Sequence, residues 1–239
     1  MKKLVSLLAV AILTMAAGSA FAVPLDPNLV RPVTPNPAAP GENSLQTELN
    51  SIFGAGVVNA ATDQLKVGMF QVGLPGSNSI NPQFKFEWTS NSGSQTIGIF
   101  GWNGTFAVTS QIFAGSQGAG DTAIVTWLTS SSGTINSFDN GSLVSSIAFS
   151  DISKDFFGFY FQVGNIKYYT VDSLNDGQAR VLGFQPNLLG AVFAYEDGSD
   201  FDYQDAGFLV ESIRPASEPV TLILLGSGLL GLAAIRRKK

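Results

Sequence analysis

The sequence predicts an all-β protein: an antiparallel β-sandwich or jelly roll with one short N-terminal helix, flanked by a signal peptide and a C-terminal single transmembrane helix. The first observation is a series of short apolar or alternating runs rich in Phe, Val, Ile, Thr and Tyr, separated by Gly, Ser, Asn and Asp. The second is an apolar run beside basic residues at each end of the 239-residue chain. The roughly 170 residues of the central region suffice for one substantial core, so one domain is expected rather than two.

The N-terminal 22 residues have the pattern of a secretory signal peptide. Lys2 and Lys3 precede an almost unbroken apolar run over 4–17, and Ala20 and Ala22 supply the small residues of a cleavage site. The alternative is an N-terminal membrane anchor, but the run is short for a span. We therefore expect cleavage between Ala22 and Val23, which removes residues 1–22.

Residues 23–42 are predicted to be a Pro-rich linker. Six of the eleven prolines fall in this segment. Proline lacks a backbone N–H and restricts φ, so this density disfavours helices and sheet ladders and favours an extended, semi-rigid spacer.

The body of the protein, residues 43–214, is predicted to be the β-sandwich domain. Ser44 or Asn43 can cap a short helix whose apolar residues, from Leu45 to Phe53, share one face, and Gly54 can end it. The runs expected to form strands are 83–88, 96–100, 105–112, 123–128, 143–149, 156–163, 166–171, 181–184, 191–195 and 207–213.

Composition and charge exclude several classes of function. The chain has no Cys and no His, which removes thiolate nucleophiles, Ser-His-Asp catalysis and the usual zinc ligands. Six basic residues and Glu218 lie in the two terminal segments, so residues 23–214 together keep 7 basic and 17 acidic residues and carry about −10. Such a body would repel nucleic acid, and no nucleic-acid partner is expected.

Residues 215–239 are predicted to be a membrane-held tail. The segment 220–235 is uncharged and mostly Leu, Ile, Ala and Gly. As a helix it would span about 24 Å, slightly less than the hydrocarbon core of about 30 Å. Snorkelling of the basic residues 236–239 and local bilayer thinning can close this gap. The basic end would stay in the cytoplasm, which places the body outside.

The same tail resembles the PEP-CTERM sorting signal, also named the ice-binding protein C-terminal domain, in which Pro-Glu-Pro precedes a short span and a basic end. Glu218 and Pro219 match, and Ser217 stands where the first proline is usual. The resemblance implies processing by an exosortase, a membrane transpeptidase of Gram-negative bacteria that make exopolysaccharide. The protein would cross the inner membrane, be anchored transiently, and then reach the cell surface or extracellular matrix. A permanent single-span anchor is the alternative.

An acidic turn between the last two expected strands is the main candidate for a ligand site. It holds five carboxylates within ten residues: Glu196, Asp197, Asp200, Asp202 and Asp205. Carboxylates this dense repel one another unless they are solvated or share a cation, and oxygen-rich clusters suit Ca²⁺. On an extended segment Asp200 and Asp202 would share a face, whereas Asp205 would need a bend to join them. A solvated acidic turn is the alternative to a calcium site.

This turn also resembles the end of a largely uncharacterised β-rich domain family of secreted proteins. Its pattern is Phe-Glu-Asp, a short glycine-containing loop, and Ser-Asp-x-Asp-Tyr-Asn-Asp. Residues 195–197 match the first part and 199–205 the second, with Gln204 in place of the usual Asn and a shortened loop. The resemblance extends loosely back to the expected helix and strengthens the expectation of Ca²⁺ as the only cofactor.

These observations predict a secreted, non-enzymatic protein of the cell surface or the exopolysaccharide-associated matrix. One alternative is a carbohydrate-binding module for the exopolysaccharide, with Trp88, Trp102 and Trp127 lining a sugar-binding face. A further alternative is a glycosidase that uses two carboxylates about 5–10 Å apart in a cleft.

Overall fold

The structure, a computed structural model, describes residues 31–66, 68–74, 76–88, 92–187 and 190–216. They belong to one compact unit, Val23–Ala216. The expected signal peptide (1–22) and transmembrane segment (220–235) lie outside the described residues. Within the described residues, no helix has the length and apolar character needed to cross a bilayer.

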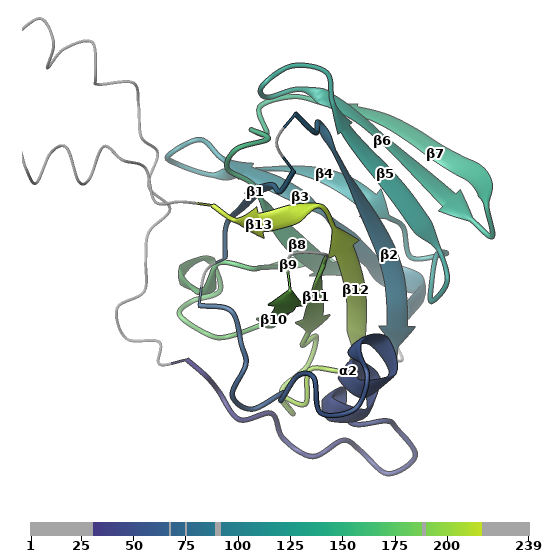
Figure 1. The fold of residues 1–239 in the computed structure, drawn as a ribbon, viewed down its shortest axis with the longest axis vertical. Coiled ribbons are helices and arrows are strands. Elements are labelled where there is room, and N and C mark those ends of the chain that lie inside the picture. Colours follow the sequence, from purple (N-terminus) through teal and green to yellow (C-terminus); the bar gives the residue numbers. More distant parts are fainter. Residues whose placement is uncertain (1–30, 67, 75, 89–91, 188–189, 217–239) are drawn as a thin grey trace, which may run out of the picture. The chain divides into compact units, whose positions relative to one another are not determined.

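The described residues confirm the predicted all-β class. Their strands form antiparallel sheets, and two of these sheets contain most of the strands (Figure 1). The larger has seven strands in the order β10-β11-β12-β2-β5-β6-β7. Their bounds are β2 (Ser79–Glu87), β5 (Thr122–Trp127), β6 (Gly133–Asp139), β7 (Ser142–Phe149), β10 (Val181–Asn187), β11 (Gly190–Tyr195) and β12 (Ala206–Glu211).

The smaller sheet has four strands in the order β4-β3-β8-β9. Their bounds are β3 (Gln95–Trp102), β4 (Ala107–Phe113), β8 (Gly158–Val163) and β9 (Ile166–Tyr169). A separate pair joins β1 (Phe70–Val72) to β13 (Ile213–Pro215), and two short 3-10 helices cover Ser92–Ser94 and Asp172–Leu174.

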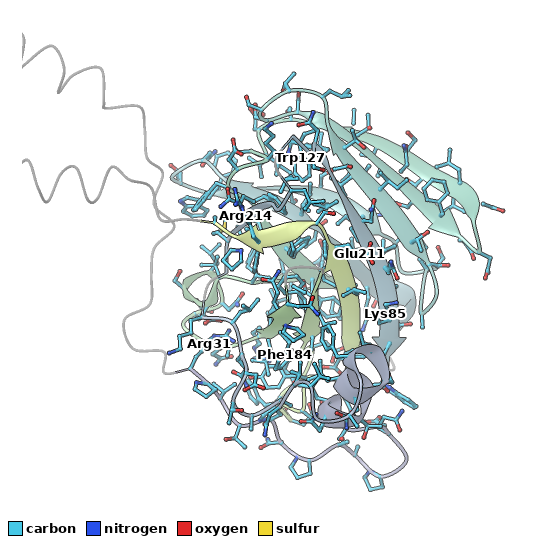
Figure 2. All side chains as sticks on the ribbon, in the orientation of Figure 1. Arg31, Lys85, Trp127, Phe184, Glu211 and Arg214 are labelled. Carbon is cyan, nitrogen blue, oxygen red and sulfur yellow. The ribbon has the colours of Figure 1, made fainter. Side chains whose placement is uncertain are left out.

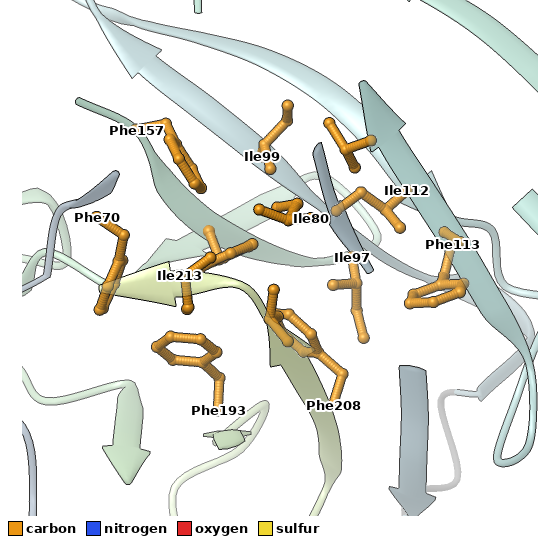
Figure 3. Close-up of a cluster of buried hydrophobic side chains, with 14 of the residues drawn as sticks. Phe70, Ile80, Ile97, Ile99, Ile112, Phe113, Phe157, Phe193, Phe208 and Ile213 are labelled. Atoms are coloured by element: carbon orange, nitrogen blue, oxygen red, sulfur yellow. The ribbon is translucent and has the colours of Figure 1, made fainter. Parts of the chain in front are cut away.

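The two main sheets enclose a core of apolar side chains, and this packing makes the molecule a sandwich (Figure 3). Aromatic rings meet across the interface: Phe159 of β8 lies 4.8 Å from Phe193 of β11, and Phe161 lies 4.9 Å from Tyr195, centroid to centroid. Ring pairs at such distances add stability beyond the area that they bury. The alternation of buried and partly exposed residues along β2 is the period-two pattern that such packing requires.

The predicted helix forms as α2 (Leu45–Phe53). The Ser44 hydroxyl accepts a hydrogen bond from the Thr47 N–H at 3.2 Å, and Gly54 follows the last helical residue with φ 96°. Leu45 and Leu49 pack on the outer face of the larger sheet, in a second apolar cluster that includes Val192 of β11. Both faces of β11 are therefore covered, and all six of its residues are buried.

Ten predicted runs correspond to strands, with ends that differ by a few residues, whereas β1, β6 and β13 were not predicted. Strand β6 reads Gly-Thr-Ile-Asn-Ser-Phe-Asp, which looks like a turn-rich connection. It forms a strand because β5 and β7 pair with it on both sides. Backbone pairing with neighbouring strands outweighs the weak local preference here.

Residues 31–42, the described part of the predicted Pro-rich linker, contain no helix or strand and end in a turn, and they contact the body instead of forming a free spacer. Arg31, labelled in Figure 2, donates through Nε to Asp172 Oδ2 at 2.8 Å. The Gln64 side chain accepts from the Val33 N–H at 3.0 Å and donates to its carbonyl at 2.6 Å. The Asn36 N–H donates to the Phe201 carbonyl at 2.9 Å. We call residues 31–42 the N-terminal strap.

Candidate metal centre

The expected acidic turn is the connection between β11 and β12, residues 196–205, which we call the acidic loop. Strands β11 and β12 pair in register up to Tyr195 and Ala206, so the two ends of the loop are held side by side. Within the loop, Phe201 and Tyr203 have φ values of 55° and 61°, and these left-handed residues turn the chain twice. Tyr203 is buried, and its hydroxyl donates to the Ala179 carbonyl at 2.7 Å, which fixes the loop to the body.

Three carboxylates meet inside this loop. One oxygen from each of Glu196, Asp202 and Asp205 lies within 4.8 Å of the others. Glu196 is 0% exposed and Asp202 is 3% exposed, while Asp205 is partly buried. Three carboxyl groups this close and this far from solvent either share protons or surround a cation.

Backbone amides orient the three carboxyl groups. The Gly198 N–H donates to Glu196 Oε1 at 2.9 Å, and the Asp197 N–H donates to Asp205 Oδ2 at 2.6 Å. These bonds offset part of the cost of burial but supply no positive charge. Among the described residues, the salt bridge found is that between Arg31 and Asp172, and it involves none of the three.

Burial and mutual repulsion perturb the acidity of the loop. Burial is the main cause that raises the pKa of Glu196 to about 7, and the nearby Asp200 charge adds to it. Burial also raises the pKa of Asp205 to about 8, with contributions from the charges of Asp197, Glu196 and Asp202. The pKa of Asp202 is raised as well, again chiefly by burial. The loop is therefore an electrostatically unfavourable place for three negative charges unless a cation joins them.

The structure thus brings together three of the five predicted ligand residues. Asp200 is exposed, and it lies close enough to Glu196 to raise its pKa. The Asp197 carboxylate accepts from Gln95 Nε2 at 3.3 Å instead of joining the group. The segment from Asp200 to Asp202 is not extended, because Phe201 between them has a left-handed φ of 55°, and Asp205 lies with Glu196 and Asp202. The expectation of a fully solvated acidic turn is wrong, since two of the three carboxylates are buried.

The strap contributes residues that the sequence did not point to. Gln204, 1% exposed, donates through Nε2 to the Glu42 carboxylate, while its Oε1 is buried without a hydrogen-bond partner. The Glu42 charge also raises the pKa of Asp202, so it lies near the group. Asn36 Nδ2 donates to the Asp200 carbonyl. These contacts join residues more than 160 positions apart, and no local pattern announces them.

The three tryptophans do not form one sugar-binding face. Trp127, labelled in Figure 2, is 1% exposed, and its indole N–H donates to the Ile152 carbonyl at 2.8 Å, so its expected surface role is wrong. Trp102 packs against an apolar cluster around Phe100 of the smaller sheet. Trp88 is 36% exposed and donates to Glu48 Oε1 at 2.8 Å.

The arrangement of the acidic loop also differs from that expected of a glycosidase. Glu196 and Asp202 are buried against the body and do not present their carboxyl groups to a bulky substrate. The predicted cleavage residues Ala20 and Ala22 and the sorting motif Ser217, Glu218 and Pro219 lie outside the described residues.

Comparison with known proteins adds little to this geometry. No protein-family model matches the chain, and no curated protein matches it. Among solved structures, a high-affinity mannose-binding lectin of Ralstonia solanacearum matches with 17% identity, over 64% of this chain and 100% of the lectin, with a TM-score of 0.30. At this TM-score the likeness carries no argument about fold or ligand.

Proposed function

We propose that this chain is an exported, non-enzymatic protein of the cell surface or extracellular matrix, and that its acidic loop binds Ca²⁺. The observation that carries the calcium proposal is the buried group of Glu196, Asp202 and Asp205, with oxygens within 4.8 Å of one another. A cation would neutralise charges that the described residues leave without a basic partner.

The donor set favours calcium over other metals. Each donor is a carboxylate oxygen, and the chain contains no Cys or His to select a transition metal. Ca²⁺ accepts six to eight oxygen ligands in tolerant geometry. Mg²⁺ requires near-octahedral geometry and gives up its bound waters reluctantly, so it is a poorer fit to a buried group of carboxylates. The exposed Asp200 and solvent are available to supply further oxygens at the rim. We assign calcium a structural role, because it would hold both ends of the acidic loop in one arrangement.

Export and sorting rest on the terminal segments. The pattern of residues 1–22 supports secretion, and the tail from Ser217 supports recognition by an exosortase-type membrane transpeptidase. Until that processing, residues 220–235 would hold the protein in the inner membrane. The acidic body supports a role outside the cell that involves no nucleic acid.

Thermal unfolding of the full chain in mild detergent tests the calcium site. After treatment with EDTA, Ca²⁺ at about 100 times its Kd should stabilise the protein by about 2.7 kcal/mol, which corresponds to about 5–10 °C in Tm. The same concentration of Mg²⁺ should do less. Asp202→Asn and Glu196→Gln should each remove the calcium shift, while Asp155→Asn, at an exposed acidic residue outside the loop, should retain it.

An unchanged Tm with excess Ca²⁺ would reject the site. The sorting proposal has its own test, which is the intact mass of the mature protein from its native host. A mass without residues 1–22 and with the tail cut near Glu218 supports it, whereas an uncut tail points to a permanent anchor.

A further inference from the structure

The N-terminal strap is attached to the rest of the molecule at two separate places. At the first, residues 31–33, Arg31 binds Asp172 and the Gln64 side chain bonds to both backbone groups of Val33. None of these partners belongs to the acidic loop. The beginning of the strap is therefore positioned independently of the loop.

The middle of the strap bonds to the backbone of the acidic loop. The Asn36 N–H donates to the Phe201 carbonyl at 2.9 Å, and Asn36 Nδ2 donates to the Asp200 carbonyl. Both carbonyls come directly before Asp202 in the chain, and the left-handed φ of Phe201 sets their directions. The arrangement of the loop that brings Asp202 to the other two carboxylates thus also presents these carbonyls to Asn36.

The end of the strap fixes the side chain of Gln204. Its Nε2 donates to the Glu42 carboxylate, and because an ionised carboxylate only accepts, the amide nitrogen and not the oxygen must face Glu42. The Gln204 side chain is 1% exposed, and its Oε1 is buried without a hydrogen-bond partner. Buried polar atoms in proteins are as a rule bonded, so this oxygen points to a ligand.

Gln204 also lies beside the buried carboxylates. Its backbone N–H donates to Asp202 Oδ1 at 3.4 Å, and Asp205 is the next residue in the chain. Side-chain amide oxygens bind Ca²⁺ alongside carboxylates. An amide oxygen carries no formal charge, so it adds a ligand without adding to the repulsion among the three carboxylates.

We propose that calcium binding in the acidic loop and docking of residues 36–42 on that loop stabilise each other, and that Gln204 Oε1 is a further ligand of the cation. This inference rests on the calcium site proposed above. The cation removes the repulsion that disfavours the observed arrangement of the loop. The docked strap in turn holds Gln204, and the two carbonyls before Asp202, in that same arrangement.

Such a coupling is reciprocal: the factor by which Ca²⁺ favours docking equals the factor by which docking favours Ca²⁺. The contact consists of a few hydrogen bonds, so we expect a factor of about 5–20, in the lower part of the usual range for coupled sites. Residues 36–42 would then be released when calcium is scarce and held when it is abundant, whereas residues 31–33 would stay in place in both states.

Electron paramagnetic resonance of a spin-labelled full chain in mild detergent tests the docking. The chain has no Cys, so Ala39→Cys carries a single label at an exposed residue between Asn36 and Glu42. Saturating Ca²⁺ should remove most of the mobile component that this label shows in EDTA. Thr34→Cys, exposed and next to the anchored Val33, is the matched control, and its spectrum should be the same in EDTA and in Ca²⁺.

Calorimetric titration with Ca²⁺ tests the reciprocal effect. Asn36→Ala removes a bond between strap and loop and leaves every carboxylate in place, so a change in affinity reports docking alone. We expect its Kd for Ca²⁺ to rise about 5–20-fold. Thr34→Ala, at an exposed strap residue outside the segment 36–42, should bind Ca²⁺ like the unaltered chain.

Tb³⁺ bound in place of Ca²⁺ tests the assignment of Gln204. Bound water shortens the Tb³⁺ emission lifetime, and lifetimes in H₂O and D₂O count the waters on the ion. Gln204→Met removes the amide oxygen at similar side-chain volume, and about one additional water should take its place. Asn36→Ala, which removes no ligand, should leave the count unchanged.

The coupling is wrong if the Ala39 label keeps its mobile component at a Ca²⁺ concentration that already raises the Tm, or if Asn36→Ala binds Ca²⁺ like the unaltered chain. The assignment of Gln204 is wrong if Gln204→Met shows the same number of bound waters. In these cases the calcium site itself still stands, because the Tm shift is measured separately. The absence of any Tm shift rejects the site and the coupling together.

Discussion

The side-chain amide of Gln204 donates a hydrogen bond to the carboxylate of Glu42, which lies 162 residues earlier in the chain. This bond joins the N-terminal strap to the acidic loop beside the proposed calcium ligand Asp202. The strap therefore supports the loop, and a segment that the sequence marks as a spacer contributes to the candidate site.

Two substitutions of Glu42 distinguish the contribution of its hydrogen bond with Gln204 to stability from the contribution of its negative charge. Glu42→Ala leaves the buried Gln204 N–H without its acceptor, whereas Glu42→Gln keeps an acceptor oxygen and removes only the charge. We expect the alanine variant to be about 1–3 kcal/mol less stable than the glutamine variant, the usual cost of an unsatisfied buried group. Urea denaturation in EDTA measures the difference. Equal stability of the two variants would show that the bond contributes nothing.

The stability of the calcium-free protein should fall as the pH rises from about 4 to 8. The folded-state pKa values of Glu196 and Asp205, about 7 and about 8, lie above the ordinary values near 4. Over this interval the folded state binds more protons than the unfolded state, so each rise in pH favours unfolding. Ca²⁺ competes with these protons, and its stabilisation should be larger at pH 8 than at pH 5.

Tm values measured between pH 4 and 8, with EDTA or with Ca²⁺, check both trends. The double variant Glu196→Gln/Asp205→Asn should flatten the EDTA curve. A calcium shift that shrinks towards pH 8 would contradict the assignment of these carboxylates as ligands.

Gly207 on β12 should not tolerate a side chain. A Cβ at this position would overlap the ring of Phe86 on the neighbouring strand β2. We expect Gly207→Ala to destabilise the protein by about 1–3 kcal/mol, the usual cost of overpacking. Gly93→Ala, where a Cβ meets no atom within 4 Å, is the control. Urea denaturation measures the free energy of unfolding of each variant. Adding Phe86→Leu to Gly207→Ala should recover part of the lost stability. If the effects of the two substitutions simply add, the side chains at these positions do not overlap directly.

Trp88 offers a test of the carbohydrate-binding alternative. It is 36% exposed, and the other two tryptophans pack into the body. Trp88→Ala removes the hydrogen bond to Glu48 and should therefore lower the stability of the protein. If the protein is not a sugar-binding module, the same substitution should leave its retention on matrix polysaccharide unchanged. Loss of polysaccharide binding in this variant, with its Tm preserved, would favour the carbohydrate-binding module instead.

Local patterns predicted the parts of the fold that depend on neighbouring residues. Ser44 and Gly54 marked the ends of α2 because capping is a matter of three or four adjacent residues. The hairpin of β11 and β12 was predicted from its two apolar runs and the polar turn between them. Strand β6 was missed because its polar sequence becomes a strand only when β5 and β7 pair with it.

By itself, the sequence determined the all-β class, the position of the helix, the acidic character of the loop and the patterns that predict export and sorting. Only the tertiary structure decided that Asp205 lies with Glu196 and Asp202, that Glu42 reaches Gln204, and that Trp127 lies in the core. The reason is physical. Composition and periodicity report what each short segment prefers, whereas the order of strands in a sheet and two left-handed residues in one loop determine which distant side chains meet.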